Sequence, residues 1–64
     1  MKEIFNNKIL IVDDEKNHRL MLKLHVEDLG FEVIEAANGV EALQKISNNY
    51  FFAILMDVKM DMMD

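Results

Sequence analysis

Hydrophobic and polar positions divide the chain into segments of two alternating kinds. The stretch KILIVDD, residues 8–14, is a continuous apolar run rich in β-branched residues that ends in two acids. Such a run is typical of a strand that is buried on both faces. The stretch FFAILM, residues 51–56, is a second run without alternation, and FEVIEA, residues 31–36, alternates. The pattern therefore predicts three strands.

Residues 15–29 carry apolar side chains at helical spacing, which predicts a first helix. Gly30 follows at the position where a helix usually ends. The stripe that we expect to face inward consists of Met21, Leu22, Val26 and Leu29, together with His18 and His25. The two histidines are interpreted as partly buried side chains that hydrogen-bond to backbone, and the alternative is a metal or phosphotransfer role.

A second helix is predicted from the capping signal that precedes it. Asn38 and Glu41 have the three-residue spacing of a capping box. We expect Ala42, Leu43 and Ile46 to face inward from this helix.

The element order β-α-β-α-β with short connections predicts a parallel sheet and an α/β fold class. Both crossovers must be right-handed, so a reversal of winding gives the strand order 2-1-3 with one helix on each face. The alternative order 1-2-3 would leave one face of the sheet bare. We therefore expect 2-1-3.

Three acids follow the two apolar strands, at the point where the winding reverses. Asp13 and Asp14 end the first strand, and Asp57 ends the third. Ligand sites in open parallel sheets lie at the carboxyl ends of strands at such a point. Converging carboxylates repel unless one is protonated or a cation is bound, and hard oxygens favour Mg2+ over zinc. The alternative treats the first two acids as a helix N-cap and the third as a solubilising residue.

Composition limits the classes of function. The 64 residues are at most one small domain, residues 1–64, and a chain of this size is only marginally stable by itself. The net charge of -5 disfavours binding to nucleic acid or to an anionic membrane. No apolar run has the length of a membrane span. The absence of cysteine and of a signal peptide fits the cytoplasm.

The segments ILIVDDEKN, EAANGVEAL and ILMDVKM together resemble the N-terminal half of a response-regulator receiver domain, the phospho-accepting module of two-component signalling. The resemblance implies half of a flavodoxin-like doubly wound fold. It implies that Asp57 is the phospho-acceptor and that Asp14 and Asp57 bind Mg2+ directly. Asp13 would act through water, and the backbone carbonyl of Lys59 would be a further ligand.

The same resemblance implies a partner and a class of activity. The phosphoryl donor would be a sensor histidine kinase or a phosphotransfer protein, and the chain would be a signalling module rather than an enzyme. Asp61 stands where the family usually has proline. The family's second half, with its hydroxyl and lysine that bind phosphoryl oxygens, has no counterpart in these 64 residues.

The third strand would be an edge of the sheet, and an unpaired edge is a template for pairing with another chain. We expect a homodimer with a six-stranded sheet, 2-1-3-3-1-2. The alternative functions are an interaction module that keeps the acidic pocket without switching, or a fragment of a longer regulator. The residues of the expected edge are Phe51, Phe52, Ala53, Ile54, Leu55 and Met56.

Overall fold

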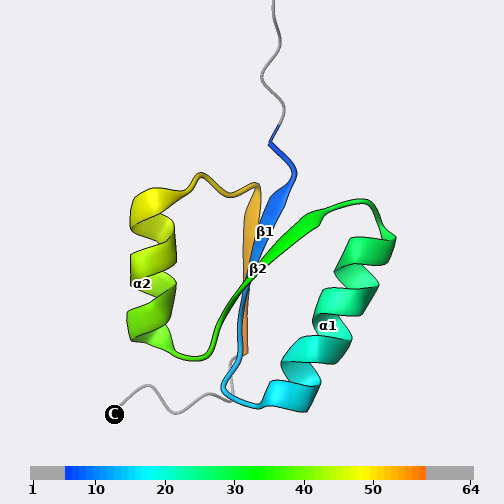
Figure 1. Cartoon of the computed structure of the whole chain (residues 1–64), viewed down its shortest axis with the longest axis horizontal. Coiled ribbons are helices and arrows are strands. Elements are labelled where there is room, and N and C mark those ends of the chain that lie inside the picture. Colours follow the sequence, from blue (N-terminus) through cyan, green and yellow to red (C-terminus); the bar gives the residue numbers. More distant parts are fainter. Residues whose placement is uncertain (1–5, 58–64) are drawn as a thin grey trace, which may run out of the picture.

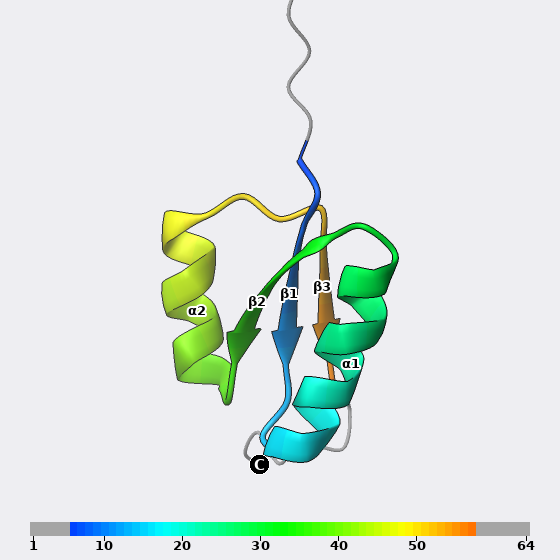
Figure 2. The same ribbon diagram turned by 45° about the vertical axis from the view of Figure 1, so that its right-hand side comes forward.

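The computed structural model describes residues 6–57. The three strands form one parallel sheet in the order β2-β1-β3, and all of them point to the same end of the molecule (Figure 2). This confirms the predicted α/β fold class and the order 2-1-3. The elements in chain order are β1 (Lys8–Val12), α1 (Lys16–Asp28), β2 (Glu32–Ala36), α2 (Gly39–Asn48) and β3 (Ala53–Met56).

The two helices lie on opposite sides of the sheet (Figure 1). Both pack on β1 and β2. The arrangement follows from two right-handed crossovers that run in opposite directions from β1. Neither helix covers β3, and the side chains of Ile54, Leu55 and Met56 remain 40–47% exposed. Among the described residues, no helix has the length and apolarity needed to cross a membrane.

The core is built on β1, as its continuous apolar run predicts. Every residue from Ile9 to Val12 is buried, so the strand is covered on both faces. On the side of α2, Leu10 and Val12 pack against Ala36 and Ala42. The parallel register pairs Leu10 with Ile34 on one side and with Ile54 on the other.

The ends of the helices form as the sequence predicts. The Asn38 side chain accepts a hydrogen bond from the Glu41 N–H at 2.9 Å, and the Glu41 carboxylate accepts one from the Ala37 N–H at 2.8 Å. The first bond satisfies one of the N–H groups that a helix start leaves unpaired, and the second holds the residue just before the N-cap. Gly30 follows α1 with a φ of 100°, a left-handed conformation that glycine adopts without a steric penalty.

The prediction of which residues face inward is partly wrong for both helices. Ala42 is buried and Leu22 and Val26 are partly buried, as expected. The reason is geometric, because three short strands give each helix only a narrow surface to pack on. Residues at the sides of the inward-facing row of each helix lie beyond the edge of that surface. The predicted inward residues that are instead exposed are Met21, Leu29, Leu43 and Ile46.

The third strand is shorter than its apolar run. It begins at Ala53 rather than at Phe51, although the Phe52 N–H already donates to the Lys8 carbonyl at 2.8 Å. The Phe52 ring stacks on Phe31, with ring centroids 5.6 Å apart. Phe52 therefore owes its place in the apolar run to this ring contact just before β3, and not to a position within the strand.

Leu10→Ala should unfold or nearly unfold the chain. Leu10 is 0% exposed, and a buried leucine truncated to alanine costs about 2–5 kcal/mol of unfolding free energy. That is comparable to the whole stability of a domain this small, about 5 kcal/mol or less. The matched control is Leu43→Ala, because Leu43 is 67% exposed. Urea denaturation followed by circular dichroism should give a much lower midpoint for Leu10→Ala, and equal midpoints would contradict the placement of the core.

Candidate functional site

The ends of β1 and β3 bring two acids side by side. The sheet hydrogen bonds continue one residue past the strands: the Asp13 N–H donates to the Ala36 carbonyl and the Asp57 N–H donates to the Val12 carbonyl, each at 3.1 Å. Because Val12 pairs with Met56, the next residues in register are Asp13 and Asp57. Paired residues of parallel strands project to the same face of the sheet. Both carboxylates therefore lie on one face, at the carboxyl end of the sheet.

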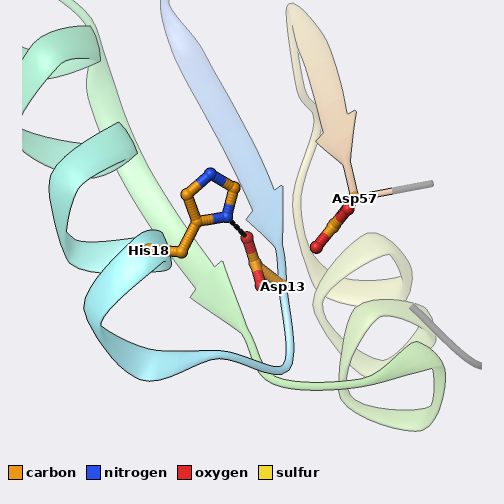
Figure 3. A group of neighbouring side chains, drawn as sticks. All are labelled: Asp13, His18 and Asp57. Atoms are coloured by element: carbon orange, nitrogen blue, oxygen red, sulfur yellow. Dashed lines mark hydrogen bonds and ion pairs between the residues drawn. The ribbon is translucent and has the colours of Figure 1, made fainter. Parts of the chain in front are cut away.

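A histidine from the helix completes a group of three. Asp13, His18 and Asp57 each offer one ligand atom, and these atoms lie within 4.8 Å of one another. Figure 3 shows the three side chains, which come from the end of β1, the start of α1 and the end of β3. The convergence of Asp13 and Asp57 is as predicted from the strand order. Asp14 is not a member of this group.

Asp13 is fully buried, and its carboxylate is held from two sides. One oxygen accepts the Glu15 N–H at 2.9 Å, and the other is hydrogen-bonded to Nδ1 of His18. The hydrogen bond from the Glu15 backbone lowers the pKa of Asp13 below the usual carboxyl range, and the hydrogen bond and charge of His18 and the charge of Arg19 act in the same direction. Burial opposes them but does not prevail. Asp13 is therefore ionised at neutral pH.

The loop between β1 and α1 decides where Asp14 lies. Glu15 is the N-cap of α1, and its carboxylate accepts the His18 N–H at 2.7 Å. The alternative in which Asp13 and Asp14 form the N-cap is therefore wrong. Asp14 is exposed and lines a hollow of about 490 Å³. The other residues that line this hollow are Glu15, Asn17, His18, Met21 and Asp57.

His18 differs from its interpretation in the sequence. Its side chain is 45% exposed, and it bonds a carboxylate rather than backbone. His25 is also exposed. The reason is that His18 lies in the first turn of α1, beside the end of β1, and not in the packed middle of the helix. A histidine five residues after Asp13, across a strand-to-helix turn, is the signal that could have placed it at the site.

Asp57 lies between two hollows, the larger lined mostly by polar and charged residues and the smaller mostly by apolar ones. A second hollow, of about 330 Å³, is lined by His18, Leu22, Leu55, Met56 and Asp57. The Asp57 side chain is partly buried and borders both hollows. A carboxylate in this position is supported by the sheet and accessible to a small group.

The donor chemistry fits a divalent cation. Asp13, Asp14 and Asp57 supply the carboxylate oxygens that Mg2+ takes as ligands. Lys59, the expected backbone ligand, and Asp61 lie outside the described residues. The assignment of individual ligands stays a prediction from the sequence.

Comparisons with known proteins give the family. The model of the response regulator receiver domain matches residues 9–64. The chain is 44% identical over 59 residues to the transcriptional regulatory protein SrrA of Staphylococcus aureus strain NCTC 8325 / PS 47, and equally to that of strain COL. These matches cover 92% of the chain but only 24% of SrrA, so the chain spans about a quarter of the length of these relatives. No solved structure matches at a significant level. With its parallel sheet of order 2-1-3 and its acids at the carboxyl edge, the chain belongs to the response regulator receiver domain family.

Proposed function

We propose that the chain is a phospho-accepting module in which Asp57 receives a phosphoryl group while Mg2+ is bound beside it. The observation that carries the proposal is the placement of Asp57 and the ionised Asp13 within one small group at the carboxyl edge of the sheet. Like charges this close favour a bound cation. Packing alone gives no reason to bring two acids together at this edge.

The proposed transfer needs little covalent chemistry from the protein. A carboxylate oxygen of Asp57 attacks the phosphorus of a phosphohistidine, the O–P bond forms and the N–P bond breaks. The donor imidazole leaves with the bonding electron pair and takes up a proton. Mg2+, when bound, neutralises charge on the oxygens of the transferred group. The chain itself contributes an acceptor whose position is fixed by the hydrogen bond from its own N–H to Val12.

The surroundings of the acids suit the proposed ligand roles. Both oxygens of Asp13 already accept hydrogen bonds, from Glu15 and His18, which agrees with an action on Mg2+ through water. Asp14 is exposed on the wall of the larger hollow and is available as a direct ligand together with Asp57. The backbone carbonyl of Lys59 remains a proposed ligand by family resemblance.

The partner follows from the chemistry of the donor. We assign the phosphoryl donor to a sensor histidine kinase or a phosphotransfer protein, which makes the chain a signalling module rather than an enzyme, working in the cytoplasm. The relatives from Staphylococcus aureus are described as transcriptional regulators, and they are about four times as long. No contact with nucleic acid or a membrane is proposed for this chain, whose net charge is -5.

A second candidate function is an interaction module that keeps the acidic pocket without switching. The exposed apolar side chains of β3 favour it, because an edge strand with apolar neighbours is a surface for pairing. The proposed partner is a second copy of the chain, joined through β3 about a two-fold axis. The two functions differ in whether Asp57 is phosphorylated.

Acetyl phosphate with Mg2+ should label the chain slowly, at Asp57. The acceptor and the acidic pocket are present, but the family's hydroxyl and lysine partners have no counterpart in these residues. Intact mass should rise by one phosphoryl group, and Asp57→Asn should abolish the rise. Asp28→Asn, at the exposed end of α1, is the matched control and should leave labelling unchanged. Labelling that survives Asp57→Asn would reassign the acceptor, and no labelling at all would favour the interaction module.

Titration with MgCl2 should move the amide resonances of residues 13–15 and of Asp57. These amides surround the acids that we propose as ligands, and weak binding should require millimolar metal because few protein ligands are engaged. Asp57→Asn should reduce the shifts, whereas Asp28→Asn should not. Unchanged spectra at millimolar Mg2+ would remove the proposed metal site.

Ile54→Lys should disrupt assembly and folding together. Ile54 is 44% exposed on the edge strand, and burying one such side chain is worth roughly 1.5–3 kcal/mol. The free energy gained by burying a few such side chains is comparable to the whole unfolding free energy of a small domain. Pairing of two chains should therefore be coupled to folding. Leu43→Lys, on the exposed side of α2, should remain folded and dimeric. Analytical ultracentrifugation with circular dichroism tests both variants. A compact, cooperatively melting monomer of the unmodified chain at micromolar concentration would refute edge pairing.

A further inference from the structure

His18 is the one histidine of the described helix α1 that lies at the acidic pocket. It is the third residue of α1, and its own N–H is fixed by the hydrogen bond to the Glu15 cap. Its ring is bonded through Nδ1 to Asp13, and its side chain borders both hollows that Asp57 borders. The ring is therefore positioned by two independent contacts, one of the backbone and one of the side chain.

The spacing of the three donors is close to what one metal ion needs. The ligand atoms of Asp13, His18 and Asp57 lie within 4.8 Å of one another. In a tetrahedral site with bonds of about 2.1 Å, two ligand atoms of one ion lie about 3.4 Å apart. The widest pair must therefore approach by about 1.4 Å or less, the difference between 4.8 and 3.4 Å, and the hydrogen-bonded Asp13 and His18 atoms must move apart. Rotations of the three side chains are sufficient for movements of this size. Figure 3 shows the Asp57 carboxylate on the side of the sheet that carries the Asp13–His18 pair.

The imidazole changes which ion the group prefers. Mg2+ takes oxygen ligands and gains little from a nitrogen donor, whereas imidazole is a good ligand for zinc and other late divalent metals. Histidine nitrogen and carboxylate oxygen are both ligands that Zn2+ takes in proteins, and three protein ligands leave a fourth position for water. We propose that Asp13, His18 and Asp57 form a mixed nitrogen and oxygen site that binds Zn2+ more tightly than Mg2+.

This inference rests on the proposed function, because it concerns the ion held in the same acidic pocket. It assigns His18 a role as a metal ligand in addition to its hydrogen bond with Asp13. For the ion to bind at Nδ1, the proton shared with the Asp13 carboxylate leaves, and the ion takes its place between the two groups. Because Asp57 is both a ligand of this site and the proposed phospho-acceptor, bound Zn2+ would compete with the phosphoryl group for the same carboxylate.

The test is isothermal titration calorimetry of the full 64-residue chain with ZnCl2 and, separately, with MgCl2. The unmodified chain should bind Zn2+ at least tenfold more tightly than Mg2+. His18→Gln keeps a polar side chain but removes the imidazole, and it should lower Zn2+ affinity by about tenfold or more, since even loss of a residue that only supports a metal ligand costs 10–100-fold. Its affinity for Mg2+ should fall by a smaller factor, because His18 supports the Asp13 carboxylate in that case without being a ligand itself. Asp57→Asn should also lower Zn2+ affinity.

The matched control is His25→Gln, which removes an exposed imidazole from the same helix and should leave Zn2+ affinity unchanged. A second measurement does not depend on a variant that folds: in the unmodified chain, Zn2+ should shift the imidazole ring resonances of His18 but not those of His25. Circular dichroism verifies the fold of each variant before titration.

The outcomes separate this inference from the proposed function. Mg2+ binding with equal Zn2+ affinities in His18→Gln and His25→Gln would overturn the inference and leave the proposed function intact. Zn2+ binding that requires His18 but survives Asp57→Asn would also overturn it, because the ion would then be at a surface histidine. Zn2+ binding that requires both residues, in a chain that acetyl phosphate does not label, would support the inference and reject the proposed function. Binding of neither ion would overturn the inference together with the proposed metal pocket.

Discussion

The pairing of β1 with a neighbour on each side is the constraint on which the other features depend. β1 lies between β2 and β3, and its side chains are buried on both faces of the sheet. One helix lies on each face (Figure 1). A strand in that position has no surface left for polar side chains until it ends. The first polar residue after β1 is Asp13, which therefore lies at the carboxyl edge of the sheet. The neighbouring strand β3 ends at the same edge and is followed by Asp57.

The attachment of α1 to the sheet depends more on ion pairs than that of α2. No residue of α1 is buried, although Leu22 and Val26 are partly covered. Arg19 bonds Glu35 of β2 at 2.8 Å and donates to the Asp13 carbonyl at 2.7 Å. Arg19 is thus a link between the carboxyl end of β2 and the loop that carries the site. The Arg19–Glu35 pair is partly buried, so salt screens it less than a pair at the surface, whereas α2 is anchored by Ala42 in the core.

Sequence reasoning reached the strand order and the meeting of Asp13 with Asp57 because both follow from rules with few alternatives. Right-handed crossovers leave two orders, and the buried character of β1 decides between them. The contact of His18 with Asp13 is harder to predict, for a different reason. Its position depends on the path of the three residues between β1 and α1, and a sequence pattern does not determine whether Asp14 or Glu15 caps the helix. The exposure of Leu43 was missed because periodicity gives the direction of a side chain but not the width of the surface it meets.

A sheet in which all strands are parallel contains no hairpin, and this affects how the site forms during folding. Each strand pair is joined through a helix, so the chain must close a long loop before either pairing gains contacts. Asp13 and Asp57 meet only when β3 adds to β1, the pairing that spans most of the chain. No local fragment can carry the two acids together. Any ion that needs both carboxylates therefore binds the folded chain and not the unfolded one, and it draws the folding equilibrium toward the complete sheet by mass action.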